Sequence, residues 1–209
     1  MLFQSMTDLR QAYDAFLDIA AENNYQVGAV PPILAVVDRS ITIARAGGVQ
    51  EKSFFGVAPT SDLDGWMKLD LSAGLPPELG LGIVGFDMFL DTLDVDPADT
   101  SDLSDVLEAL SKAEVLLKIN GNIAGRCRGR DCLVGDVSSR ISAGDTSSFV
   151  RGGLEAGTTP FMLPRPYLVG PTQKVQLLLK VDAAIFSGVA ADPLVFGRLH
   201  TFIASKTSF

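Results

Sequence analysis

The chain has 209 residues, of which 47% are apolar and 20% are charged, and its formal net charge is −8. This length suits one β-sandwich or barrel whose core needs no disulfides, and the acidic balance argues against a protein that wraps nucleic acid. The longest apolar runs, 79–86 and 183–191, fall far short of the about 20 residues of a membrane-spanning helix. We therefore expect other subunits to cover much of the apolar surface. The first residues lack the features of a secretory signal, so we expect synthesis and folding in the cytoplasm.

Residues 7–23 carry apolar side chains at helical spacing, which predicts an amphipathic helix. Its apolar stripe includes Leu9, Tyr13, Phe16 and Ala20. Two interpretations stay open: the helix packs on the chain's own sheet, or it is an arm whose named residues dock on a neighbouring subunit. Because Pro31-Pro32 then breaks the chain, we assign 1–30 to a helical arm and 31–209 to a β domain.

After this break the pattern is that of short strands separated by turns rich in glycine and proline. A short inserted helix is expected at 103–112 and a polar loop at 138–148. In the clearest strand, alternating apolar residues indicate one buried face; they are Val175, Leu177, Leu179 and Val181. Strands are expected at 33–45, 52–57, 66–71, 115–119, 132–137, 161–169, 174–186 and 194–204, and 81–93 is expected to begin as a loop and end as a strand. About eight to ten strands predict a mainly β chain, folded as an antiparallel sandwich or barrel.

Catalytic chemistry would have to be built around His200, the one histidine of the chain. A metal site of the cupin type needs several histidines, and neither cysteine lies in a recognisable nucleophile motif. Gly80, Gly82 and Gly85 precede an expected strand rather than a helix, so they do not form a nucleotide-binding fingerprint. We therefore expect no enzyme activity, no catalytic, cofactor-binding or metal-binding residue, and no cofactor. His200 is interpreted as a histidine of the sheet or of an interface.

One short segment combines the densest basic cluster with both cysteines of the chain. Arg126, Arg128 and Arg130 are interpreted as a basic contact loop for a phosphate, a lipid headgroup or an acidic neighbour. Plain solvated surface is the alternative for these arginines. Cys127 and Cys132 would close a small ring if they were oxidised, but a cytosolic protein keeps its thiols reduced, so two free thiols are expected.

An acidic run occupies the middle of the chain. Aspartates before a helix cap its first turn and suit its positive end, and the central glycine and terminal glutamate of an EF-hand loop are missing. We interpret the run as helix capping and solubility, with a site for a divalent cation as the alternative. Its members are Asp87, Asp91, Asp94, Asp96, Asp99, Asp102 and Asp105.

The last third of the chain carries a family resemblance. The run FMLPRPYLV at 161–169, the turn Gly170-Pro171 and the long strand at 174–186 resemble jelly-roll capsid proteins of tailless, icosahedral, membrane-containing bacterial viruses. The likeness covers the overall layout and roughly residues 159–204. It implies a single jelly roll, because a double one needs a longer chain, and a self-assembling capsid subunit located in the virion. The implied partners are other copies of the chain, other capsid subunits and an internal lipid membrane, without direct nucleic-acid binding and without catalytic residues.

A carbohydrate- or receptor-binding β-sandwich module of the fibre or spike type is the alternative function. A sugar platform would need exposed aromatic side chains, for which Trp66, Tyr25 and Tyr167 are the candidates, with Tyr13 on the expected helix. A pair of them exposed in a shallow groove would favour this alternative.

Overall fold

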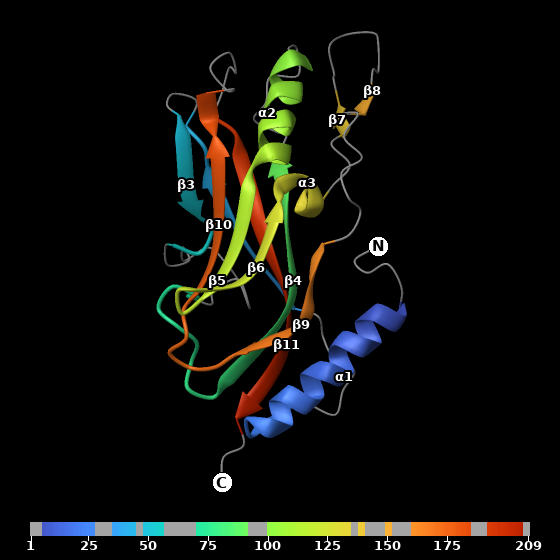
Figure 1. The fold of residues 1–209 in the computed structure, drawn as a ribbon, viewed down its shortest axis with the longest axis vertical. Coiled ribbons are helices and arrows are strands. Elements are labelled where there is room, and N and C mark those ends of the chain that lie inside the picture. The colour runs from blue at the N-terminus through green and yellow to red at the C-terminus, as the bar shows by residue number, and fades with distance from the viewer. Residues whose placement is uncertain are drawn as a thin grey trace.

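The computed structural model describes residues 6–27, 35–44, 48–56, 70–91, 100–134, 138–140, 149–151, 160–184 and 192–206. Within these ranges the chain is mainly β, and its two larger sheets are antiparallel (Figure 1). The helices are α1 (Met6–Glu22), α2 (Thr100–Lys112) and α3 (Gly129–Cys132). The strands are β1 (Tyr25–Gln26), β2 (Ala35–Thr42), β3 (Val49–Ser53), β4 (Leu79–Asp91), β5 (Glu114–Ile119), β6 (Asn122–Arg128), β7 (Ser138–Arg140), β8 (Phe149–Arg151), β9 (Phe161–Val169), β10 (Val175–Asp182) and β11 (Leu194–Lys206).

The two larger sheets form the layers of a sandwich. Sheet A has the order β1-β11-β4-β9, with β2 also paired to β11, and sheet B has the order β3-β10-β5-β6. The pairing is nested: β2 pairs with β11, β3 with β10, β4 with β9, and β5 with β6. The chain from β2 to β11 is therefore arranged like one long hairpin that is rolled into two sheets. Strands β7 and β8 form a separate pair.

The closed end of this long hairpin is the turn between β5 and β6. Its two residues, Asn120 and Gly121, have φ angles of 51° and 82°. A two-residue hairpin turn of type I′ needs positive φ at both positions, and Asn-Gly is its preferred sequence. The Asn120 side-chain oxygen also accepts a hydrogen bond of 2.9 Å from the backbone N–H of Lys174. This bond ties the turn to the segment that leads into β10.

The main core lies between the inner faces of the two sheets. The alternation predicted for the strand at 174–186 is confirmed, because its four apolar residues are buried in this core. Helix α2 confirms the inserted helix and contributes Val106 and Leu110 to the core. Helix α3 then leads from β6 of sheet B to Leu133, which forms a bridge with Met88 on β4 of sheet A. Helix α3 and the bridge between Leu133 and Met88 thereby connect the two sheets at this place.

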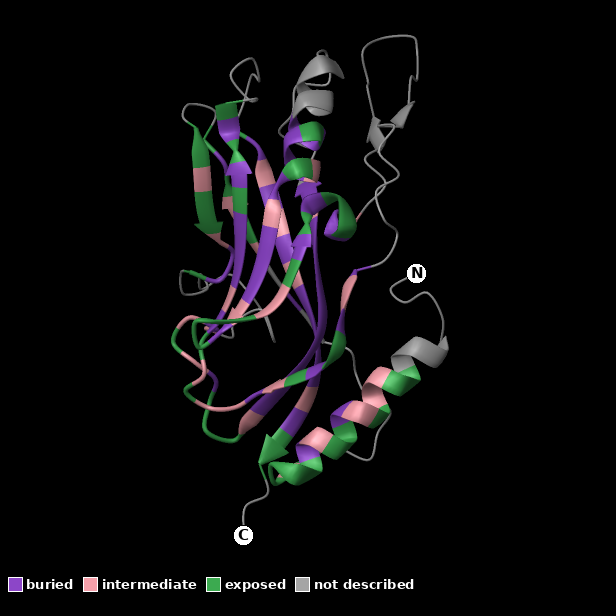
Figure 2. Ribbon diagram, viewed as in Figure 1, coloured by how far each residue is buried: buried purple, intermediate pink, exposed green. Residues whose placement is uncertain are grey.

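Helix α1 confirms the helix predicted at 7–23 and packs on the outward face of sheet A (Figure 1). Figure 2 shows its buried positions turned toward the sheet and its exposed positions turned away. The ring of Phe16 stacks on Phe202 of β11, with centroids 5.5 Å apart, and Ala20 is buried beside them. Gly82 of β4 lies under this ring, where a Cβ atom would come within 2.3 Å of Phe16. The glycine therefore allows the helix to approach the sheet closely.

This packing corrects the interpretation that the apolar stripe of the helix docks on a neighbouring subunit. Phe16 and Ala20 are buried in the chain itself, and Tyr13 is half-buried in an edge-on contact with Phe202. The side chain of Leu9 lies outside the described residues. The apolar stripe has an apolar partner on the chain's own sheet, and burying the two together removes both from water. Residues 25–26 of the predicted arm also form β1, which pairs with the end of β11.

Several predicted strand boundaries are wrong. The strand expected at 52–57 is found at 49–53, and the segment 81–93, expected to begin as a loop, is part of a strand from its first residue. The start of the strand expected at 132–137 is wrong, because Cys132 is the last residue of α3. The Asp131 carboxylate stabilises this helical turn by accepting a hydrogen bond of 3.3 Å from the backbone N–H of Arg128. Residues 135–137 lie outside the described residues.

Two further segments are described only in part. Of the strand expected at 66–71, only Asp70 and Leu71 are described, and they begin a turn. The Asp70 carboxylate accepts hydrogen bonds from the hydroxyl of Ser72 at 2.6 Å and from the backbone N–H groups of Ser72 and Ala73. The hydroxyl bond is the main cause that holds the pKa of Asp70 below its usual value. Of the loop expected at 138–148, residues 138–140 form β7 and the others are outside the described residues.

Candidate functional site

The central strand pair of sheet A carries polar and aromatic side chains on its outward face, beyond the part that α1 covers. Residues opposite each other in this antiparallel pair are Phe196 with Phe89, Arg198 with Asp87, and His200 with Gly85. Because side chains alternate along a strand, the intervening residues of β11 point into the main core. Strand register and side-chain alternation together therefore place these polar and aromatic residues side by side on the outward face of sheet A.

Asp87, Arg198 and His200 form what we call the ion cluster. The Asp87 carboxylate accepts two hydrogen bonds from Arg198, from Nε to Oδ1 at 2.5 Å and from Nη2 to Oδ2 at 3.0 Å. His200 Nε2 lies 2.9 Å from the same Oδ2. The side chains of Asp87 and His200 are 0% exposed, whereas that of Arg198 is 25% exposed. One buried carboxylate thus holds a guanidinium group whose other side reaches the surface, and such two-pronged pairs fix the plane of the guanidinium.

His200 leaves one ring nitrogen without a partner. Its Nδ1 atom is buried and makes no hydrogen bond within the part of the chain that the structure describes. The tautomer that donates from Nε2 to Asp87 leaves Nδ1 as a bare acceptor. An unsatisfied buried polar atom costs about 1–3 kcal/mol, and such atoms are rare in native proteins. This atom marks the ion cluster as a candidate site.

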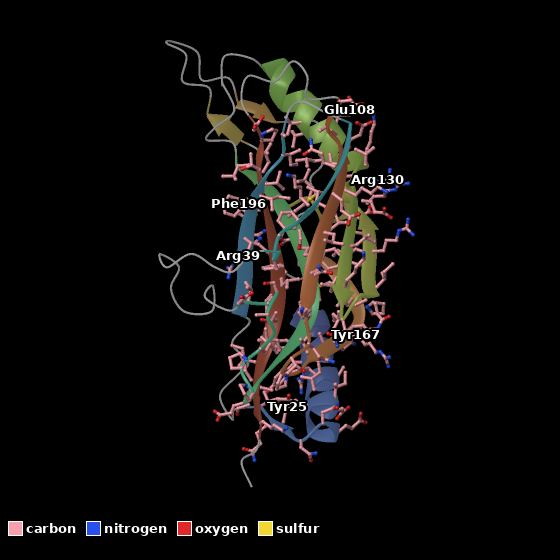
Figure 3. The ribbon with its side chains drawn as sticks, turned by 90° about the vertical axis from the view of Figure 1, so that its left-hand side faces the viewer. Tyr25, Arg39, Glu108, Arg130, Tyr167 and Phe196 are labelled. Carbon is pink, nitrogen blue, oxygen red and sulfur yellow. The ribbon has the colours of Figure 1, made fainter. Side chains whose placement is uncertain are left out.

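Next to the ion cluster along β4 and β11 lies an aromatic patch formed by Phe89, Phe196 and Arg198. The two rings stack with centroids 4.8 Å apart and planes 7° from parallel, and the Arg198 guanidinium carbon lies 4.6 Å from the centre of the Phe89 ring. Both phenylalanines are half-buried and belong to neither apolar core. Figure 3 shows Phe196 on the side of the sandwich away from Arg130. The ion cluster therefore positions an arginine between water and a flat aromatic surface.

This arrangement suits binding of a protein surface. Aromatic residues and arginine are enriched among the residues that dominate the energy of protein interfaces, especially where they are rigidly held. The Arg198 side chain is held by two bonds to a buried carboxylate, so little of its conformational freedom remains to be lost on binding. The aromatic patch therefore combines two stacked rings with a rigidly held arginine.

Neither His200 nor Asp87 was recognised as part of a site from the sequence. The sequence places Asp87 in the acidic run and predicts a sheet or interface position for His200, which lies in strand β11. The available signal was the alternation of Phe196, Arg198 and His200 along one strand. An aromatic and two polar side chains at every second position indicate an outward face that is not plain solvent-exposed surface.

The other members of the acidic run do not form a described site. The side chains of Asp91, Asp94, Asp96, Asp99, Asp102 and Asp105 lie outside the described residues. Among the residues that the structure describes, no three His, Cys, Asp or Glu side chains gather as metal ligands would. The expectation of a cation site therefore stays an untested alternative.

The three arginines expected to form a basic contact loop are brought together, but not by a loop. Arg126 and Arg128 lie on β6, the edge strand of sheet B, and Arg130 lies in α3. The two-residue turn at Asn120-Gly121 folds β6 back onto β5, so the segment that carries Arg126 and Arg128 forms a strand rather than a loop. All three side chains are exposed. Arg126 forms an ion pair with Glu114, and Arg130 Nε lies 3.7 Å from Asp131 Oδ1.

Both cysteines are free thiols and both are buried. The Cys132 thiol lies 3.6 Å from the carbonyl oxygen of Gly129, and hydrogen bonding with Cys127 together with burial raises the pKa of Cys132 far above its usual range. We expect the native protein to react slowly with an aromatic disulfide reagent at pH 8, because the thiolate is the reactive form. In denaturant both thiols should react at the rate of a free cysteine. Full reaction of both thiols at that rate in the native protein would contradict this burial.

The aromatic residues considered for a sugar platform are not assembled into one. Tyr13 and Tyr25 are half-buried in the contact between α1 and sheet A. Tyr167 is exposed on β9, and Trp66 lies outside the described residues. Figure 3 shows Tyr25 and Tyr167 at different places near the lower end of the sandwich. An exposed pair of these Trp and Tyr residues, which would favour a carbohydrate-binding module, is not found among the described residues.

No protein-family model, curated protein or solved structure matches this chain. In the described residues, no helix has the length and apolar character required to cross a membrane. The function is therefore argued from strand order and from the surfaces described above.

Proposed function

We propose that this chain is a virion structural protein, a single jelly-roll subunit that self-assembles into the capsid of a bacterial virus. The observation that carries the proposal is the strand order. If the strands from β2 to β11 are numbered without the separate β7–β8 pair, the first pairs with the last, and the pairing continues inward to β5 with β6. A jelly roll has eight strands in two sheets and this nested order.

The connections between the sheets support the same assignment. The chain changes sheet at every step through this set of strands except from β5 to β6. In an up-and-down meander, by contrast, consecutive strands pair with each other. Repeated crossing is what a rolled hairpin requires, so the topology favours a jelly roll over a meander.

Jelly rolls occur in capsid proteins, lectins and cupins, so the strand order alone does not decide the function. A cupin metal site needs several histidines, and this chain has one. The aromatic patch of Phe89, Phe196 and Arg198 is half-buried, and a buried carboxylate holds its arginine. Together with the 47% apolar composition, this patch supports a subunit whose surface is covered on assembly.

Sedimentation velocity of the purified protein over a wide range of concentrations tests the proposal. A capsid subunit should give species much larger than the 22.2 kDa chain, and their fraction should rise with concentration. A single 22.2 kDa species at every concentration, also in the presence of co-expressed capsid subunits, would overturn it.

Replacing Phe196 with serine should weaken assembly. The aromatic stack is expected to lie near the centre of a contact, where loss of an anchor side chain costs about 2 kcal/mol or more. The protein concentration at half-assembly should therefore rise by more than about tenfold. Val49→Ser is the matched control, because Val49 is 65% exposed on the edge strand β3. Equal assembly of the two variants, with native circular dichroism, would show that the aromatic patch is not an interface.

A further inference from the structure

The arginine stripe, formed by Arg126, Arg128 and Arg130, stands out on a chain whose net charge is −8. Arg126 and Arg130 each have a carboxylate nearby on the same chain. Arg128 instead donates to the carbonyl oxygen of Lys112 at 3.3 Å, and it makes no ion pair within the described residues. The stripe therefore carries positive charge that the described part of the chain does not neutralise.

An acidic stripe runs along the outward face of α1. Asp14, Asp18 and Glu22 are exposed and four residues apart, so they lie on one side of the helix. Arg10 lies 3.9 Å from Asp14. Asp18 and Glu22 make no ion pair among the residues that the structure describes. Unmatched negative charge thus faces outward beyond the chain's own sheet.

The spacings of the two stripes match. Side chains four residues apart on a helix are separated by about 6 Å along its axis. Side chains two residues apart on a strand, such as Arg126 and Arg128, are separated by about 6.7 Å. An α1 helix laid along β6 would therefore bring successive carboxylates opposite successive guanidinium groups.

Each stripe also carries an exposed apolar side chain. Leu17 lies between Asp14 and Asp18 on α1 and is 36% exposed, and Ile123 is the second residue of β6 and is 56% exposed. They are two of the four large apolar residues exposed in the described part of the chain. An apolar contact flanked by paired charges has the usual composition of a protein interface.

The two stripes do not meet within one chain, because α1 and the β6–α3 region lie at separate places in the sandwich (Figures 1 and 3). We propose that the arginine stripe of one copy binds the acidic stripe of α1 on a second copy. This inference depends on the proposed self-assembly. The contact joins two different surfaces, so it can repeat from copy to copy. Such head-to-tail contacts build rings or extended arrays rather than isolated dimers, as a shell requires.

Charge reversal tests this contact. Arg128→Glu and Asp18→Arg should each raise the concentration needed for half-assembly by about tenfold or more, because each places like charges opposite each other. The double variant Arg128→Glu, Asp18→Arg should assemble nearly as well as wild type, because the attraction is restored in the opposite sense. Salt should weaken wild-type assembly, since exposed charges are screened.

The controls are Lys52→Glu and Glu51→Arg, which make the same two charge changes at exposed positions of β3. They should assemble like wild type, and all variants should keep the circular dichroism of the folded wild-type protein because the positions are exposed. If wild type assembles but the reversals do not differ from these controls, or the double variant is no better than the singles, the contact is refuted while the proposed function stands. A wild type that never assembles would refute the proposed function itself.

Discussion

Replacing Asp87 with alanine should lower the free energy of unfolding by about 3–5 kcal/mol, the usual effect of removing one partner from a buried ion pair. Asp87 is 0% exposed, and it accepts two hydrogen bonds from Arg198 and lies within hydrogen-bonding distance of His200. Its loss would leave the partly buried guanidinium and the fully buried imidazole without their acceptor. Urea unfolding followed by circular dichroism measures the difference.

The control for Asp87 is Asp14→Ala, which removes an exposed carboxylate that lies 3.9 Å from Arg10. A surface pair of this kind contributes less than about 1 kcal/mol. The variants Arg198→Met and Asp87→Ala should also be coupled, so that their combined effect is smaller than the sum of the two. A change below about 1 kcal/mol for Asp87→Ala would contradict the ion cluster.

Replacing Phe16 with alanine should lower the free energy of unfolding by about 3–5 kcal/mol, as for other buried phenylalanines. The Phe16 ring is 0% exposed, stacks on Phe202 and lies over Gly82. Its removal leaves a cavity between α1 and sheet A that the helix backbone cannot fill. Hydrogen exchange should show that the amides of α1 lose protection more than those of β10.

The control for Phe16 is its neighbour Leu17, which is 36% exposed on the other side of the helix. Leu17→Ala should change the stability of the monomer by less than about 1 kcal/mol. The same pair of variants tests which sheet α1 packs on. If α1 docked on a neighbouring subunit, the effect of Phe16→Ala would vanish on dilution; packing on the chain's own sheet predicts an effect independent of concentration.

Strong periodicity explains which elements could be predicted from the sequence. Helix α1 and strand β10 each carry one clear apolar stripe. The helix, predicted at 7–23, is found at 6–22, and the strand, predicted at 174–186, is found at 175–182. Strand β6 is not predicted from the sequence because Gly125, Arg126 and Arg128 interrupt its apolar pattern. The dipeptide Asn120-Gly121 is the local signal for this strand, because a two-residue hairpin turn requires a strand on each side.

The ion cluster could not be predicted because it depends on strand register. Asp87 and Arg198 are 111 residues apart in sequence and meet only because β4 and β11 pair in one register. A shift of β11 by one residue would turn the Arg198 side chain to the core face, away from Asp87. Local pattern likewise cannot tell whether the apolar stripe of α1 meets its own sheet or another copy, since both partners offer the same chemistry. Packing against Phe202 decided that question.

Electron microscopy of the purified protein tests the capsid proposal most directly. At high concentration and low salt, we expect closed shells or regular rings of subunits, and we expect Phe196→Ser to lose them while Val49→Ser keeps them. Fields that contain only particles of a single 22.2 kDa chain, under every condition in which the protein is folded, would contradict the account.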